Sequence, residues 1–98
     1  MIDLEKYQNE INQLCQKYNV KKLTIFGSAL SEQFKESSDI DFLLELKSAE
    51  GGIKKYMNIK FELEKLFKRP VDLVMPKAIK NQRIKKYMHS DMKEVYAA

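Results

Sequence analysis

The residues whose type and spacing best suit metal binding or catalysis are two carboxylates, Asp39 and Asp41. If residues 39–46 form a strand, positions i and i+2 point to one face and lie about 6–7 Å apart. Carboxylates held side by side repel each other unless a cation lies between them, and Mg²⁺ prefers carboxylate and phosphate oxygens. A lone Asp-x-Asp pair is nevertheless common, and most such pairs are solvated turn or surface residues. The pair therefore predicts a metal site only together with other features.

A third carboxylate, Asp72, lies within the apolar run from Val71 to Val74. A charged side chain inside such a strand is costly unless its surroundings compensate it. If this strand lies beside the strand of Asp39 and Asp41, three carboxylates can converge. They could then hold two ions about 3.5–4 Å apart, as in two-metal phosphoryl or nucleotidyl transfer. The alternative is that Asp72 simply pairs with a lysine or arginine.

The dipeptide Gly27-Ser28 follows an apolar run and precedes a possible helix start. Glycine lets a phosphate approach the backbone closely, and a helix N-terminus offers free N–H groups to an anion. The Ser28 hydroxyl adds a further donor. These features favour a nucleotide-binding turn at Gly27 and Ser28, whereas the dipeptide alone would be read as a plain strand-to-helix connection.

Hydrophobic periodicity predicts the elements that must position these residues. A helix is expected over residues 3–18, a buried strand over 23–26, a short helix or turn over 28–34 and a strand over 39–46. A second helix is expected from Ile53 to Phe67, with Tyr56, Met57 and Leu63 among its apolar positions. A strand over 71–75 and a helix starting near Pro76 complete the chain, which Met92, Val95 and Tyr96 finish.

This order, α-β-(α)-β-α-β-α, predicts an α/β (α+β) fold in which a small mixed β-sheet is flanked by helices. A chain of 98 residues suits a single domain, 1–98. No apolar run reaches the roughly 20 residues that cross a bilayer, and the acidic N-terminus is unlike a signal peptide. The single cysteine, Cys15, is expected to pack in the core, and a cytoplasmic location is expected.

Charge is unevenly distributed along the chain. Residues 1–50 carry 6 lysines and 9 acidic residues, a net of −3, whereas residues 51–98 carry 12 basic and 5 acidic residues, a net of +7. A basic half suits an anionic partner such as a nucleotide phosphate, a nucleic acid or an acidic protein surface, or it is only a solvated lysine-rich surface. Nucleic acid is the weakest of these because few aromatics interleave the basic residues and no nucleic-acid-binding motif is evident.

The combination of Gly27-Ser28, a ten-residue interval and Asp39-x-Asp41 resembles the signature of the DNA polymerase beta-like nucleotidyltransferase superfamily. The stretch FGSALSEQFKESSDIDFLLEL is similar to the minimal nucleotidyltransferase (MNT) branch, the branch of the MntA antitoxins. The similarity continues through RPVDLV, in which Asp72 matches the third carboxylate of the family, and reaches EVYAA. It therefore covers nearly the whole chain.

The resemblance implies a nucleotidyltransferase fold with three or four strands, two Mg²⁺ ions held by Asp39, Asp41 and Asp72, and a nucleoside triphosphate as substrate. It also implies AMP transfer from ATP to a tyrosine of a HEPN-domain toxin, which would make the chain an antitoxin. Close relatives usually carry arginine where this chain has Ser31. An antitoxin that acts by contact, with a weak or vestigial nucleotide site, is therefore the alternative to an enzyme.

Overall fold

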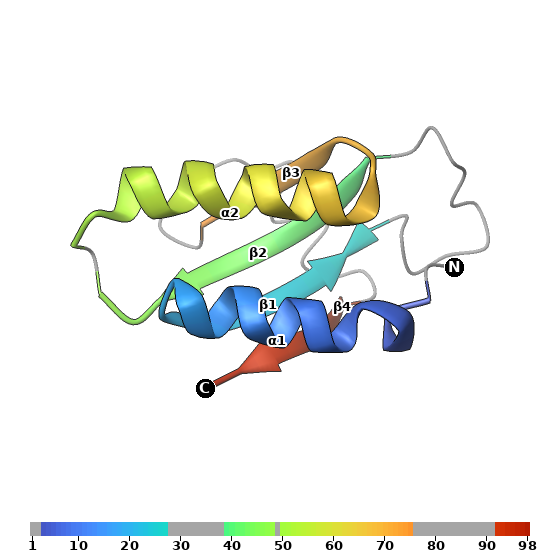
Figure 1. The fold of residues 1–98 in the computed structure, drawn as a ribbon, viewed down its shortest axis with the longest axis horizontal. Helices are drawn as coiled ribbons and strands as arrows, with labels where there is room; N and C mark the ends of the chain where they lie inside the picture. The colour runs from blue at the N-terminus through green and yellow to red at the C-terminus, as the bar shows by residue number, and fades with distance from the viewer. Residues whose placement is uncertain (1–2, 28–38, 49, 76–91) are drawn as a thin grey trace.

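In a computed structural model of the chain, described for residues 3–27, 39–48, 50–75 and 92–98, four strands form one mixed sheet (Figure 1). The strands are β1 (Val20–Phe26), β2 (Ile40–Leu46), β3 (Val71–Val74) and β4 (Met92–Ala97), in the spatial order β3-β2-β1-β4. β1 pairs antiparallel with β2 and β4, and β2 pairs parallel with β3. The predicted small mixed sheet is confirmed.

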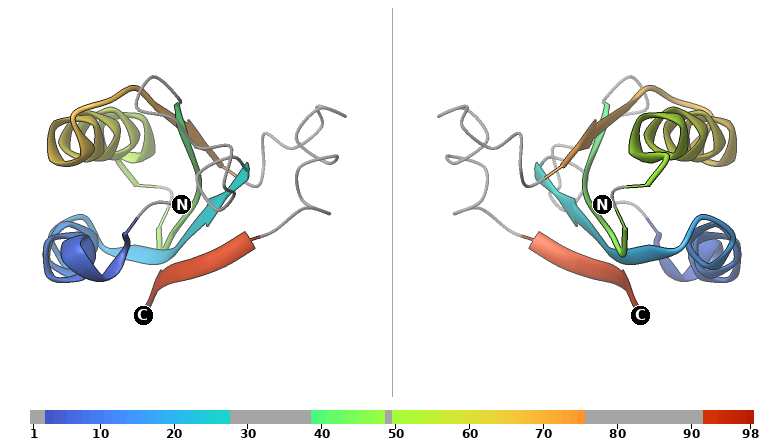
Figure 2. Two further views of the ribbon diagram at one scale, coloured as in Figure 1. Left: turned by 90° about the vertical axis from the view of Figure 1, so that its right-hand side faces the viewer. Right: turned by 90° about the vertical axis from the view of Figure 1, so that its left-hand side faces the viewer.

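The helices of the described residues lie on one face of this sheet (Figure 2). A 3-10 turn, η1 (Glu5–Tyr7), leads into α1 (Gln8–Lys17), and α2 (Gly52–Phe67) connects β2 to β3. Parallel neighbours require such a crossover because the end of the first strand and the start of the second lie at opposite ends of the sheet. α2 therefore returns the chain from the end of β2 to the end of the sheet at which β2 began.

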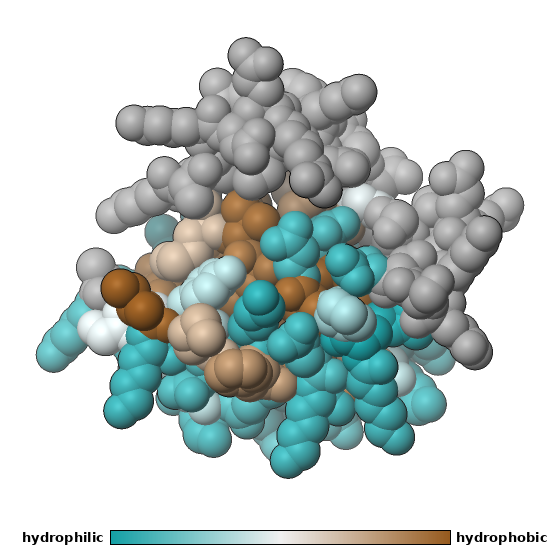
Figure 3. Space-filling view, turned by 90° about the horizontal axis from the view of Figure 1, so that it is seen from above, coloured by the Kyte–Doolittle hydropathy of each residue, from teal (hydrophilic) through white to brown (hydrophobic). Residues whose placement is uncertain are grey.

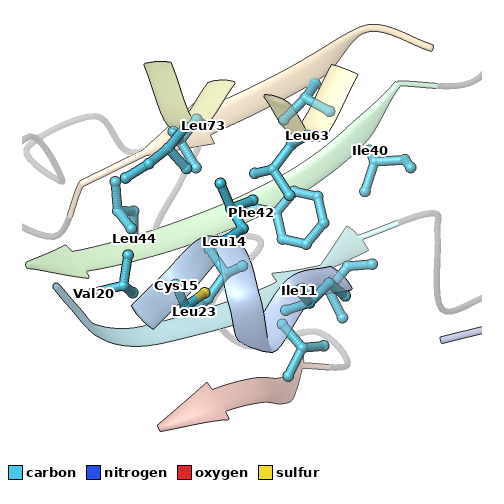
Figure 4. Packing of buried hydrophobic residues seen from close by; sticks show 14 of the residues in the cluster. Ile11, Leu14, Cys15, Val20, Leu23, Ile40, Phe42, Leu44, Leu63 and Leu73 are labelled. Carbon is cyan, nitrogen blue, oxygen red and sulfur yellow. The ribbon is translucent and has the colours of Figure 1, made fainter. Parts of the chain in front are cut away.

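The core lies between the sheet and these two helices (Figure 4). In β2, alternate residues point toward the helices, so Ile40, Phe42 and Leu44 are fully buried. Phe67 of α2 packs its ring against Phe42 in a tilted arrangement, with ring centroids 5.8 Å apart. The helices add side chains at three- or four-residue spacing, which are Ile11, Leu14 and Cys15 from α1 and Ile59, Leu63 and Phe67 from α2. Cys15 is a buried packing residue, as expected.

The predicted order is wrong at the C-terminus, where it contained no strand. Residues 92–97 form β4, which pairs with β1 and buries Val95. Methionine, lysine, glutamate and alanine in this segment suit a helix as well as a strand, so local preference does not decide. The side of β1 away from β2 offers unpaired backbone groups, and pairing with them decides for a strand.

The second helix is confirmed, but two of its apolar residues do not face the core. Ile53 is 85% exposed and Met57 is 42% exposed. Met57 precedes the buried Ile59 by two residues, which is about 200° around a helix. Ile53 lies four residues before Met57 and therefore shares its side of α2.

Two predicted elements, the turn or helix over 28–34 and the helix starting near Pro76, lie outside the described residues. In the part of the chain that the structure describes, no helix combines the length and the apolarity that crossing a membrane requires.

Candidate active site

The predicted site residues lie at one end of the sheet, where β1 ends and where β2 and β3 begin. β1 ends at Phe26, immediately before Gly27, whereas β2 and β3 begin there. In the register of the sheet, Asp41 of β2 lies opposite Asp72 of β3 on one side and opposite Phe26 of β1 on the other. Neighbouring strands are about 4.8 Å apart. The register of the sheet thus brings Asp72 close to Asp41, which is 31 residues earlier in the sequence, and toward Gly27, which is 45 residues earlier.

The carboxylates lie on the face of the sheet away from the helices. Ile40 and Phe42 point into the core, so Asp41 between them points to the other face. Asp72 is flanked in the same way by the buried Val71 and Leu73, and it is exposed. Asp41 is half-buried. Two of the three predicted carboxylates therefore share a face on adjacent strands.

Asp39 precedes β2 directly and is exposed. The N–H of the next residue, Ile40, donates to the carbonyl of Pro70 at 3.1 Å, so β2 is attached to the approach to β3 from its first residue. Strand alternation carried back from Asp41 puts Asp39 on the carboxylate face. Within residues 3–27, 39–48, 50–75 and 92–98, no three side chains of His, Cys, Asp or Glu gather closely enough to hold a metal. Convergence of all three carboxylates stays a prediction.

Gly27 has a role in this geometry that the sequence did not indicate. Its φ is +79°, in the region that favours glycine, and a Cβ placed on it would lie 2.7 Å from Oδ2 of Asp41. The space that a side chain would fill is therefore occupied by the Asp41 carboxylate. Sequence reasoning assigned Gly27 to phosphate approach; the strand order that sets it beside Asp41 was the missing signal. Ser28 and Ser31 lie outside the described residues.

Two side chains of α2 fix the start of β3 and were not singled out from the sequence. Glu64 accepts a hydrogen bond from the Val71 N–H through Oε2 at 3.1 Å. The Tyr56 hydroxyl donates to the carbonyl of Leu73 at 2.7 Å. Both hydrogen bonds involve backbone groups of the residues on either side of Asp72, so they hold the backbone at Asp72 in position. Polar residues interleaved with an amphipathic helix are too common for sequence alone to identify this pair.

The donors at this end of the sheet are carboxylate oxygens, which match a hard cation such as Mg²⁺. Asp41 and Asp72, directly opposite each other, carry like charges whose repulsion such a cation would relieve. Lys68, exposed, and Arg69, half-buried, lie in the turn that precedes β3. The residues present therefore fit a divalent cation together with an anionic ligand.

Comparison with known proteins gives one family. A family model described as "Polymerase beta, Nucleotidyltransferase" matches residues 9–98, which include every carboxylate of the candidate site. A protein of Methanocaldococcus jannaschii, named "putative protein adenylyltransferase", is 39% identical over 79 residues, which make up 81% of this chain and 80% of that protein.

Solved structures share the fold at lower identity. A crystal structure of a toxin–antitoxin with AMP-PNP aligns with a TM-score of 0.70 at 18% identity, over 93% of this chain and 73% of the other. A structure of a tri-AMPylated Shewanella oneidensis HEPN toxin in complex with MNT antitoxin aligns with a TM-score of 0.67 at 17% identity, over 98% of this chain and 74% of the other. At these identities the likeness shows a common fold.

Proposed function

The chain belongs to the polymerase beta nucleotidyltransferase family, and on that basis we propose that it transfers AMP from ATP to a hydroxyl of an acceptor protein. The observation that carries the proposal is the placement of Asp41 and Asp72 opposite each other on parallel strands, beside Gly27. The family match supports the class of reaction, and this pair would supply two of the carboxylates that hold its metal ion.

Asp39, Asp41 and Asp72 would hold Mg²⁺. Bound there, the ion would offset the charge of the triphosphate and favour loss of the acceptor proton. The acceptor oxygen forms a bond to the α-phosphorus, the bond between the α- and β-phosphates breaks, and pyrophosphate leaves. Asp72, which is more exposed than Asp41, would receive the acceptor proton. Gly27 leaves room for the Asp41 carboxylate, and Ser28 with the backbone beside it would bind the phosphates.

The acceptor we propose is a tyrosine of a HEPN-domain protein, which would make the chain an antitoxin. Support comes from relatives: one is named for protein adenylyl transfer, and chains of the same fold occur with an AMPylated HEPN toxin. The candidate site lies at an end of the sheet where Asp72 and Asp39 are exposed, so the side chain of a large acceptor can reach it.

The test is incubation of the chain with α-labelled ATP, Mg²⁺ and a HEPN-domain protein from the same genome. We expect label on the HEPN protein and its loss in Asp72→Asn. Glu45→Gln is the matched control, because Glu45 lies on the same face of β2 as Asp41 but four residues, about 13 Å, further along. Absence of label with the wild-type chain, or equal labelling by Asp72→Asn, would overturn the proposal and favour an antitoxin that acts by contact.

A further inference from the structure

The outer side of α2 carries a stripe of large apolar side chains that the core does not use. Ile53, Met57 and Phe61 are 85%, 42% and 59% exposed. Their four-residue spacing puts them on one side of the helix, over two turns or about 12 Å. Seen from the side of α2, hydrophobic residues lie among hydrophilic ones on this surface (Figure 3). We call these three residues the outer stripe.

α2 is therefore apolar on two sides. Ile59, Leu63 and Phe67 already supply the side that packs against the sheet. Single exposed apolar residues are normal on protein surfaces, but three large ones in a row on one helix mark a contact surface. Packing among the residues that the structure describes thus does not account for the stripe.

Lysines outnumber acidic residues around the outer stripe. Helical spacing makes Lys54 and Lys60 neighbours of Met57, and Lys65 a neighbour of Phe61. Among the described residues these lysines take part in no ion pair. The two acids of α2 are engaged elsewhere, since Glu62 pairs with Lys17 at 3.7 Å and Glu64 accepts from the start of β3.

This charge pattern selects between two occupants. A second copy of the chain packed antiparallel about Met57 would bring Lys54 of one copy opposite Lys60 of the other. Like charges across an interface oppose association. A different protein with carboxylates around an apolar patch would match both the stripe and its lysines.

We propose that the outer stripe is the docking surface for the acceptor protein, which would present an apolar patch rimmed by aspartate and glutamate. The inference rests on the proposed function. α2 lies on the helix-covered face, whereas Asp41 and Asp72 lie on the other face. The first turns of α2 lie over the end of β2 remote from Asp41 (Figure 1). Substitutions in the stripe therefore leave the carboxylates untouched, so binding and transfer can be measured separately.

The experiment measures the Kd between the chain and the HEPN-domain protein of the labelling assay by calorimetry. Phe61→Glu should weaken binding about 30-fold or more, the size of an interface hot spot. Lys54→Glu with Lys60→Glu should weaken it about 10-fold and reduce its dependence on salt. The matched control is Lys21→Glu with Lys47→Glu, the same charge change at exposed residues of β1 and the loop after β2, and it should bind nearly as the wild type does.

In the stripe variants, the rate of transfer at saturating acceptor and the affinity for ATP should be unchanged. Circular dichroism and Tm measurements serve as the control for folding of these variants. If Phe61→Glu binds the labelled acceptor as tightly as the wild type does, the inference fails while the proposed function stands. If the wild type binds through the stripe but transfers no label, the proposed function fails instead. A wild-type chain that does not bind the HEPN protein, or one that dimerises in sedimentation until Phe61→Glu is made, would overturn the docking proposal.

Discussion

The two faces of β2 differ in what their residues do. Ile40, Phe42 and Leu44 on one face are buried under α1 and α2, whereas Asp41 and Glu45 on the other are only partly buried. One seven-residue strand thus serves packing and candidate chemistry by simple alternation. The difference teaches that stability and transfer are separable here, because neighbouring substitutions on β2 should affect one and spare the other.

The largest effect is expected from Asp41→Asn. Loss of one carboxylate should lower AMP transfer about 10²–10³-fold, the range seen for the removal of a charge-stabilising group. The Tm without metal should hold or rise, since Asp41 faces the like charge of Asp72 across the β2–β3 pair. Radiolabel transfer and calorimetry check the two halves, and near wild-type transfer would remove Asp41 from the proposed site.

On the packed face, Phe42→Ala should lower the free energy of unfolding by about 3–5 kcal/mol. Phe42 has no exposed surface and stacks against Phe67, so its truncation leaves a cavity. Leu43→Ala, one residue later on the half-buried face, should cost clearly less. Urea unfolding of both variants measures the difference. Equal losses would mean that the two faces of β2 contribute alike to stability.

Gly27→Ala should sharpen the comparison at the point where backbone and carboxylate meet. Its matched control is Gly51→Ala, because Gly51 also has a positive φ, +64°, but an added Cβ there meets nothing within 4 Å. In both variants the free energy of unfolding should fall by about 1 kcal/mol, because alanine is strained at a positive φ. Only Gly27→Ala should also displace the Asp41 carboxylate and reduce transfer, by about 10-fold or more. Similar transfer rates in the two variants would contradict the positioning role of Gly27.

The smallest effect concerns pH and the packed side of the molecule. Burial raises the pKa of the Cys15 thiol from its ordinary value of 9.0 to about 12. Between these values the unfolded chain loses the thiol proton while the folded chain keeps it, so this contribution to stability is full below pH 9 and falls as the pH rises toward 12. The stability advantage of the wild type over Cys15→Ala should therefore shrink between pH 8 and pH 10.5, measured by urea unfolding. A constant advantage would place Cys15 in contact with water.

Much of the packed face was predictable because burial has a period. The alternation of β2 and the positions of Leu63 and Phe67 follow from hydrophobic spacing alone. Ile53 and Met57 were rightly placed in the second helix, but spacing shows only which residues are apolar, and it does not show that these two side chains are exposed. The strand at the C-terminus was missed because pairing with β1, not local preference, determines it.

The candidate site was predictable in its residue types but not in its contacts. The motif around Asp39 and Asp41 and the match of Asp72 to the family identified the carboxylates, and the register of β2 with β3 then brought two of them together. The closeness of Gly27 to the Asp41 carboxylate depends on how β1 ends beside β2, which no local pattern encodes. Long-range register is what the sequence reading lacked.

The pairing of β4 with β1 has a consequence for the order of folding. Leu23 of β1 lies opposite Tyr96 of β4, far along the chain, whereas its partner in β2, Leu44, is near in sequence. Closing the longer loop costs more chain entropy, and ribosomal synthesis supplies β4 last. We expect pulsed hydrogen exchange to protect the amide of Leu44 before that of Val95. The β1–β2 pair that bears Asp41 would then be assembled on a nascent chain before β4 is synthesised.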